Sequence, residues 1–495
     1  MRKWLLGGLG VLLLLCGGGV AAVTWLLTSG GVDTVGKVAF DRPLKIPPLA
    51  ESTVDANGTR VFDLTAEPGD SDLGHGRSTR TWGYNGAYLG PTLRAERGQK
   101  IKVNVHNRLN EPTTVHWHGM HLPAKVDGGP HHPIPVGGDY QAAWTVDQPA
   151  ATLWYHPHPS DLTERQVYRG LAGMFIVQDR EQDDEQDDLP HEYGVDDIPV
   201  IVQDKNFDGG QLSMSDRFLS DIGILGDEIL VNGTPAPFLD VRTSLVRLRL
   251  LNASTARVYD FTMSDGRPMQ LIGTDGGLLS APYPTETVRL SVGERAEVVV
   301  AMRPGERVEL RSAPTGLGRF QGGRDAFDVL QLRAKPNQLG AQPNQLKVPQ
   351  HLADIERLDP SQAAQRRTFT FQGREINDDR MDMDRVDAVV VKDTVEVWSV
   401  ANGHDTPHSF HIHDVQFQVL SVDGAAPQPE LGGWKDTLFL EPGKRYEIIA
   451  RFADYADPTT AYMFHCHVLR HEDEGMMGQF VVVEKAGDKP KLGHN

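Results

Sequence analysis

The sequence predicts an all-β protein of three similar domains, and three observations predict it: composition, length and an internal repeat. Gly (51) and Pro (32) are abundant among the 495 residues, which favours short strands joined by turns. At the usual size of a domain, a chain of this length suggests about three domains. No pattern of long helices, as an α/β fold would need, is evident.

The repeat consists of three alternating strands that each end on an asparagine. They are Lys100–Asn107, Val246–Asn252 and Thr394–Asn402, and the three asparagines are 145 and 150 residues apart. A turn signal precedes each strand: Tyr84-Asn85-Gly86, Val231-Asn232-Gly233 and Ile376-Asn377. Self-similarity at this period indicates three β domains, each the size of a small sandwich.

Composition shifts indicate the domain limits. Residues 180–189 form a charged polar run and residues 335–349 repeat Pro-Asn-Gln-Leu, so both are predicted linkers. We expect an N-terminal segment at residues 1–30 and domains at 31–182, 196–334 and 365–488.

The N-terminal segment is apolar. Trp4–Leu27 carries no charge and follows Arg2 and Lys3, and as a helix it would be roughly 36 Å long, enough to span a bilayer with its N-terminus inside. A cleavable signal peptide is the alternative, since Gly19 and Ala21 offer a processing site. Either reading predicts an extracytoplasmic protein, anchored or secreted.

Charge and cysteine usage exclude other classes. With 67 acidic and 49 basic residues the net charge is −18, which argues against a nucleic-acid partner. Cys16 and Cys466 are the only cysteines, so a disulfide framework is excluded. A lone thiol at Cys466 fits a metal ligand.

Cys466 stands between two histidines, His465 and His467. On a strand, the two imidazoles face one side and the thiol the other. A thiolate with imidazoles and a weak thioether selects an electron-transfer copper, and Cys466, His471 and Met476 are three such ligands. His465 and His467 would then bind other metals on the order of 10 Å away.

Ten of the nineteen histidines fall into four clusters. They are His116 and His118; His156 and His158; His408, His411 and His413; and His465, His467 and His471. Each His-x-His pair on a strand directs two imidazoles to one side. Ten histidines, one cysteine and one methionine exceed what one or two closed zinc sites need. The middle repeat has no such pair, so we expect metals in and between the first and third domains.

These residues resemble the four copper signatures of the multicopper oxidases, and the resemblance covers about Arg60 to Glu484. Within that family the chain is similar to the bacterial periplasmic cuprous oxidases and bacterial laccases. Supporting stretches are Val126–Pro130, Asp147–Thr152, Gly170–Gly173, Ile201–Lys205, Gly433–Thr437 and Gly475–Met477. The resemblance implies three tandem cupredoxin-like Greek-key β-sandwich or barrel domains, with a trinuclear copper cluster between domains 1 and 3.

Four copper ions are implied, one of type 1, one of type 2 and two of type 3. The implied ligands are His408, Cys466, His471 and Met476 for type 1; His116 and His411 for type 2; and His118, His156 and His467, then His158, His413 and His465, for the two type 3 ions. Electrons would pass from type 1 through Cys466 to the cluster.

The implied reaction couples four one-electron oxidations at type 1 to the reduction of dioxygen to water. Protons must accompany the electrons. By family position, Asp127 matches the acid near type 2, and Glu472 matches a proton-relay acid. We expect dioxygen and a small electron donor as partners and a monomeric enzyme. The alternative class is a non-enzymatic binding protein, like the family's copper-free cell-division relatives, which lack the ligands present here.

The chain departs from the cuprous oxidases around type 1. It has only 12 Met and none in Lys347–Phe371, where the relatives carry a Met-rich insertion; His404 and Thr406 replace their Asp and Met ligands. Thioethers select cuprous ion, so a laccase-like oxidation of phenols or aromatic amines is expected, with His471 open to bulky donors. The alternative is oxidation of Cu(I), Fe(II) or Mn(II), docked by Asp405, Asp473 and Glu474.

Overall fold

The computed structural model describes residues 31–179, 189–217, 220–336 and 347–493. The apolar Trp4–Leu27 segment lies outside these residues, as does most of both predicted linkers. Within the described ranges, no helix combines the length and apolarity needed to traverse a bilayer.

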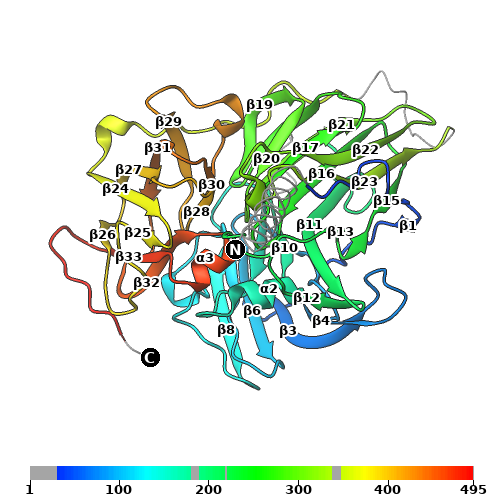
Figure 1. Ribbon diagram of the computed structural model, residues 1–495. Coiled ribbons are helices and arrows are strands. Elements are labelled where there is room, and N and C mark those ends of the chain that lie inside the picture. The colour runs from blue at the N-terminus through cyan, green and yellow to red at the C-terminus, as the bar shows by residue number, and fades with distance from the viewer. Residues whose placement is uncertain (1–30, 180–188, 218–219, 337–346, 494–495) are drawn as a thin grey trace, which may run out of the picture.

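Six β-sheets form three pairs, each enclosing its own hydrophobic core (Figure 1). The all-β prediction is confirmed. The first pair joins a five-stranded sheet of β2 (Ser52–Val54), β3 (Arg60–Ser71), β4 (Thr79–Tyr84), β6 (Lys100–Asn107) and β8 (Asp139–Thr145) with a four-stranded sheet of β5 (Leu93–Glu96), β7 (His116–His118), β9 (Ala151–His156) and β10 (Gly173–Gln178).

The second pair is the largest. Its six-stranded sheet contains β1 (Arg42–Pro43), β15 (Pro237–Val241), β17 (Tyr259–Met263), β20 (Thr287–Leu290), β22 (Arg307–Ala313) and β23 (Phe327–Ala334). Its eight-stranded sheet contains β11 (Asp197–Asp208), β12 (Gln211–Ser213), β13 (Glu228–Val231), β14 (Thr234–Pro235), β16 (Leu245–Asn252), β18 (Met269–Thr274), β19 (Gly277–Thr285) and β21 (Arg295–Ala301). β1 precedes the first pair in the chain yet lies parallel to β15, so the N-terminal part of the described chain packs on the second pair.

The third pair contains two five-stranded sheets. One holds β24 (Gln365–Gln372), β25 (Glu375–Ile376), β27 (Thr394–Asn402), β29 (Phe417–Val422) and β31 (Arg445–Phe452); the other holds β26 (Ala388–Val391), β28 (His408–Ile412), β30 (Thr437–Leu440), β32 (Asp457–Cys466) and β33 (Met477–Val483). Helices are short: α2 (Thr163–Arg169), α3 (Leu469–Asp473) and the 3-10 turns η1 (Ala124–Val126), η2 (Arg319–Gln321), η3 (Pro360–Gln362) and η4 (Pro429–Leu431).

The asparagines of the repeat do the same structural work in all three pairs. Asn107, Asn252 and Asn402 end β6, β16 and β27, and all three are buried. Each side-chain oxygen accepts from the backbone N–H two residues later, at 2.9, 3.1 and 2.9 Å. Each Nδ2 donates to carbonyls of two other segments. A buried side-chain amide thus makes hydrogen bonds to backbone groups where the chain leaves the strand. In the first and third pairs, the segment after this point leads to the histidine strands β7 and β28.

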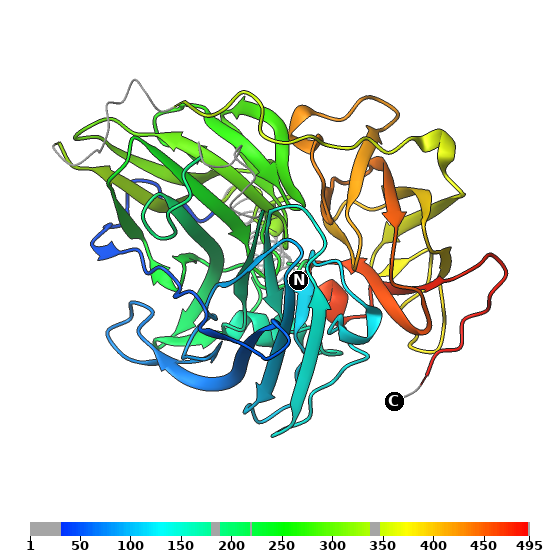
Figure 2. The ribbon, with the colours of Figure 1, turned by 180° about the vertical axis from the view of Figure 1, so that it is seen from behind.

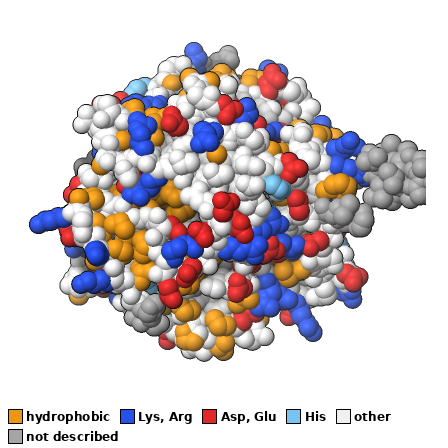
Figure 3. Space-filling model, turned by 60° about the vertical axis from the view of Figure 1, so that its left-hand side comes forward, with side chains coloured by type: hydrophobic (Ala, Val, Ile, Leu, Met, Phe, Trp, Pro, Cys, Tyr) orange, Lys and Arg blue, Asp and Glu red, His pale blue; other side chains and the backbone are white. Residues whose placement is uncertain are grey.

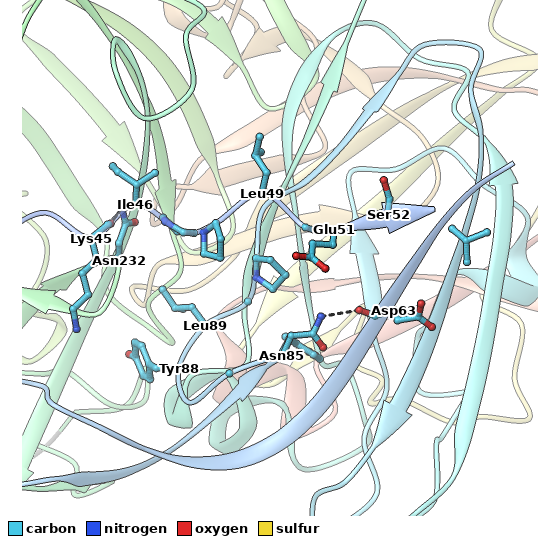
Figure 4. A pocket seen from close by; sticks show the side chains of 18 of the residues that line it. Lys45, Ile46, Leu49, Glu51, Ser52, Asp63, Asn85, Tyr88, Leu89 and Asn232 are labelled. Atoms are coloured by element: carbon cyan, nitrogen blue, oxygen red, sulfur yellow. Dashed lines mark hydrogen bonds between the residues drawn. The ribbon is translucent and has the colours of Figure 1, made fainter. Parts of the chain in front are cut away.

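The turn asparagines form a second set of equivalent positions. Asn85, Asn232 and Asn377 adopt positive φ angles of 54, 50 and 55°, a conformation that asparagine tolerates better than most residues. Asn85 and Asn232 also line a cavity of about 870 Å³ between the first two pairs, where Asn85 Nδ2 donates to the Asp63 carbonyl at 2.7 Å (Figure 4). None of the ten clustered histidines lines this cavity.

The three pairs meet at a common centre. Seen from either side, the first and third pairs lie next to each other, with the second pair alongside both (Figures 1 and 2). α2 of the first pair packs against α3 of the third. The histidine strands face this junction.

Candidate metal centres

Two antiparallel strand pairs bring most of the histidines to the junction. In the first pair of sheets, His116 lies opposite His156 on β7 and β9. In the third, His411 lies opposite His465 on β28 and β32. All ten clustered histidines and Cys466 are at most 1% exposed, so four segments far apart in sequence form one buried site.

Cys466 occupies one centre with two histidines. Its Sγ lies 3.4 Å from His408 Nδ1 and 3.5 Å from His471 Nδ1, and the two nitrogens are 3.2 Å apart. The short α3 carries His471, and Met476 is fully buried just beyond it, with its backbone N–H donating to the His471 carbonyl at 2.8 Å. Strand alternation therefore sends Cys466 into the third core and its two histidine neighbours toward the first pair.

The other eight histidines converge through their ring nitrogens in three sets. His467 Nε2 lies 3.2 Å from His118 Nδ1 and 3.4 Å from His156 Nε2. His465 Nε2 lies 3.2 Å from both His158 Nε2 and His413 Nε2. His116 Nε2 lies 3.4 Å from His411 Nε2.

These separations suit metal ions. Three nitrogens bound in a plane at about 2.0 Å from one ion are about 3.5 Å apart. Burial lowers the pKa of His408 and His465 to about 3, and lowers the pKa of His118, His156, His158, His411, His413, His467 and His471 well below its ordinary value. These nine imidazoles are therefore neutral at pH 7, the form that can bind a metal ion. Burial also raises the pKa of Cys466 to about 12, and a bound cation holds such a thiol as thiolate.

Asp127 joins two of the histidine sets. Its Oδ2 accepts from His413 Nδ1 at 2.7 Å, and its backbone carbonyl lies 3.0 Å from His116 Nδ1. It ends the η1 turn and is 2% exposed. A carboxylate on the far nitrogen of a ligand histidine fixes the ring and raises its basicity.

Glu472 stands on the opposite side, in α3. Its two carboxylate oxygens lie 3.2 Å from His158 Nδ1 and 3.3 Å from His465 Nδ1. Burial raises the pKa of Glu472 well above its ordinary value. The chain thus places a buried, readily protonated acid beside two histidines of one set.

Comparison with known proteins shows which family has this sequence. Residues 66–182, 208–307 and 351–486 match family models described as multicopper oxidase. Multicopper oxidase mco of Staphylococcus haemolyticus (strain JCSC1435) is 37% identical over 442 residues, which are 88% of this chain and 91% of that protein. The chain belongs to the multicopper oxidase family.

Other similar proteins carry different names. A laccase from Pediococcus acidilactici superposes with a TM-score of 0.82 at 33% identity, over 90% of this chain and 95% of that one. A Campylobacter jejuni multicopper oxidase described as a metallo-oxidase has a TM-score of 0.78 at 26% identity, over 92% and 98%. Cell division protein FtsP of Escherichia coli (strain K12) is 34% identical over 463 residues, 92% of this chain and 96% of that protein.

As a multicopper oxidase, the chain is a copper-dependent oxidoreductase that uses dioxygen as acceptor and has tandem cupredoxin-like domains. The donor set fits copper: imidazoles, one thiolate and one thioether are the ligands that copper takes in proteins. An oxidase of this family needs such ligands, whereas a copper-free binding protein does not.

The sequence did not reveal that the second pair of sheets in this multicopper oxidase helps to position the clustered histidines. Arg295 of β21 donates to both carboxylate oxygens of Asp436 at 2.7 and 2.6 Å. Asp436 Oδ1 in turn accepts from His118 Nε2 at 3.0 Å, and the Asp436 carbonyl lies 2.9 Å from His411 Nδ1. Because both oxygens already pair with Arg295, Asp436 orients His118 rather than binding metal. The only local signal was the Gly433–Thr437 stretch.

The absence of the Met-rich insertion predicts that His471 is open to bulky donors, and this prediction is wrong. The ring is fully buried, and the Asp221 carbonyl lies beside it. Asp221 belongs to the connection between β12 and β13 of the second pair, where Ile222 and Leu225 pack into the third core. Apolar anchors from another domain, with no sequence signature, supply this cover.

Two of the three acids expected to dock a metal-ion substrate have other partners. Asp473 accepts from the backbone N–H groups of Thr163 and Glu164 at 2.8 and 2.9 Å, at the start of α2. Glu474 pairs with Arg374 at 2.7 Å. Asp405 remains 92% exposed and lies 3.1 Å from the neighbouring His404 ring.

Proposed function

We propose that this multicopper oxidase is laccase-like and oxidises small organic donors, such as phenols or aromatic amines, one electron at a time. Four donor equivalents are oxidised for each dioxygen reduced to water. Four bound coppers supply the redox chemistry, one accepting electrons from the donor and three reducing dioxygen. The single observation that carries the proposal is a surface groove that is lined in part by Asp221, the residue whose carbonyl lies beside His471.

That groove has a volume of about 620 Å³, within the range of pockets for small organic ligands. It lies between the second and third pairs, and its lining includes Leu317, Phe320, Asp405 and Asp221. Asp221 connects the groove to the Cys466 centre, because it lines the groove and its carbonyl lies beside His471. An aromatic donor finds apolar contact on Leu317 and Phe320.

The proposed ligand assignment follows the sets of converging atoms. Type 1 copper would be held by His408, Cys466, His471 and Met476; type 2 by His116 and His411; and the type 3 pair by His118, His156 and His467, and by His158, His413 and His465. The Cys466 backbone links the type 1 set to His465 and His467 directly. Electrons entering at His471 therefore have a covalent path to the cluster.

Asp127 and Glu472 are the proposed proton-handling residues, because dioxygen reduction consumes protons in a site sealed from water. Asp127 bonds to His413 at 2.7 Å. Glu472 lies beside His158 and His465, and because burial raises its pKa it keeps its proton to a higher pH than an ordinary carboxyl group. The two acids approach the cluster from different sides.

A metallo-oxidase is the second candidate. It is favoured by the exposed carboxylate of Asp405, which lines the same groove as Asp221, because carboxylates suit Fe(II) and Mn(II). Against it, the groove is lined by Arg289 and Arg319 as well as by acids, and acidic and basic side chains are likewise interspersed on the face shown in Figure 3.

The cellular setting is proposed from the sequence. The segment Trp4–Leu27 after Arg2 and Lys3 supports an extracytoplasmic enzyme, anchored or secreted. We propose a monomer with domain limits at residues 31–182, 196–334 and 365–488.

The test compares turnover of the copper-loaded protein with a phenol, an aromatic amine, Fe(II), Mn(II) and Cu(I), measured as dioxygen uptake. Phe320→Ala should raise KM for the organic donors several-fold and leave any metal-ion turnover unchanged. Asp405→Asn should do the opposite, and Asp70→Asn, an exposed acid on β3, is the control. Rapid Fe(II) turnover that falls with Asp405→Asn, without phenol turnover, would establish the metallo-oxidase instead. A protein that binds no copper would refute both.

A further inference from the structure

Arg374 places a positive charge at the edge of the proposed type 1 site. It lies in the turn between β24 and β25, and its side chain is only 18% exposed. The guanidinium donates to Glu474 Oε2 at 2.7 Å, to the Gly373 carbonyl at 3.2 Å and to the Asp221 carbonyl. It therefore bridges the acid after α3 and the second-domain segment that covers His471.

One peptide carbonyl separates Arg374 from the site. The Asp221 carbonyl that accepts from Arg374 also lies beside His471. Arg374 is thus two polar contacts away from a proposed ligand of the type 1 copper.

A fixed charge near a redox ion changes its reduction potential. Reduction lowers the charge of the copper site by one unit, so a nearby cation favours the reduced form and a nearby anion the oxidised form. The path from Arg374 to the proposed copper consists of the contact with the Asp221 carbonyl, the contact of that carbonyl with His471, and the His471 ring. With each contact about 3 Å long, Arg374 lies roughly 10 Å from the ion. At that distance, a largely buried charge is only partly screened by salt.

We propose that Arg374 and Glu474 form an opposed charge pair that tunes the reduction potential of the type 1 copper. Arg374 raises the potential, and Glu474, which is 46% exposed and so better screened, lowers it by a smaller amount. The inference rests on the proposed type 1 site and holds for either class of donor. Neither residue touches the ligands through its own side chain, so both act by position and charge.

A purely structural role makes a different prediction. If Arg374 only clasps the cover to the third domain, any variant that loosens Asp221 should shift the potential, regardless of charge. Thr406 offers the matched control, because its Oγ1 donates to Asp221 Oδ2 at 2.8 Å. Thr406→Val removes this contact and changes no charge.

The experiment is a redox titration of the copper-loaded full chain with inorganic mediators, following the visible band of the Cys466-bound copper. Arg374→Gln should reduce the equilibrium constant for reduction about three- to tenfold, a lowering of up to about 59 mV. Glu474→Gln should shift it the other way and by less, and the Arg374→Gln, Glu474→Gln double variant should lie between. Arg374→Lys and Thr406→Val should stay near the wild type.

Several results would overturn the proposal. An unchanged potential in Arg374→Gln is one, and shifts of the same sign in both single variants, or a shift in Thr406→Val as large as that in Arg374→Gln, are others. If Arg374→Gln does not fold, the sign of the Glu474→Gln shift decides, with Arg374→Lys as the charge-preserving comparison. A wild-type protein without the visible band would refute the proposed type 1 site itself, and titration with mediators keeps that failure separate from any failure of donor specificity.

Discussion

Replacing Arg295 by methionine should empty part of the histidine cluster while leaving the Cys466 centre intact. Arg295 and Asp436 are both fully buried, and their two contacts are 2.7 and 2.6 Å. Arg295 also donates to the carbonyls of Thr152, Gly293 and Asp275 at 2.9, 3.1 and 3.0 Å. It thereby joins all three pairs of sheets.

The size of the effect follows from what remains after the substitution. Breaking a buried ion pair on one side costs about 3–5 kcal/mol, because the remaining charge is uncompensated. Asp436 then no longer presents a fixed oxygen to His118 Nε2, whose other nitrogen faces His467. Loss of such a partner typically weakens metal binding 10- to 100-fold.

The assay measures copper per chain and the visible band of the Cys466-bound copper at limiting free copper, together with urea unfolding. Arg295→Met should lower the copper content and the urea midpoint but keep the visible band. Arg247→Met is the matched control, since Arg247 is buried in the same domain and pairs with Glu297 away from the histidines. Full copper occupancy in Arg295→Met, or an equal copper loss in Arg247→Met, would refute the reasoning.

Three further outcomes are expected. Cys466→Ser should abolish the visible band and donor oxidation while the other histidine sets still bind copper, and a retained band would contradict the type 1 assignment. Burial raises the pKa of Glu472 well above its ordinary value, so the metal-free native state keeps a proton that the unfolded chain releases. Stability should therefore fall as pH rises above about 4.3, the ordinary pKa of a glutamate. Glu472→Gln should increase the urea midpoint of the metal-free protein at pH 8 but not at pH 4. Asn252→Ala and Asn402→Ala should each cost about 1–3 kcal/mol in unfolding free energy by orphaning buried carbonyls, but only Asn402→Ala should weaken the visible band, because β28 with His408 follows Asn402.

Much of the fold and of the donor set could be predicted because the signals are local. A period of two placed His465 and His467 on the face opposite Cys466, and the asparagine-terminated strands appear as β6, β16 and β27 with matching hydrogen bonds. Such patterns depend only on neighbours within a strand or turn. The family resemblance then supplied which strands approach each other.

Contacts between distant segments were not predictable in the same way. The sequence suggests Asp473 as a docking acid, yet the structure shows that it accepts two backbone N–H groups at the start of α2, 309 and 310 residues away in sequence. It suggests the same role for Glu474, which pairs with Arg374, 100 residues away. An acidic residue in a loop has the same appearance in sequence whether it is solvated or buried against another domain.

The sequence alone determined the β architecture, the buried histidine strands and the thiol between two of them, because strand alternation and turn chemistry act over a few residues. The tertiary structure alone decided how the histidine strands are held together and how His471 is covered. Arg295 from a domain without clustered histidines orients His118 through Asp436, and Asp221 of the same domain covers His471. Both depend on packing between domains, where apolar burial and paired charges bring together residues that no local pattern relates.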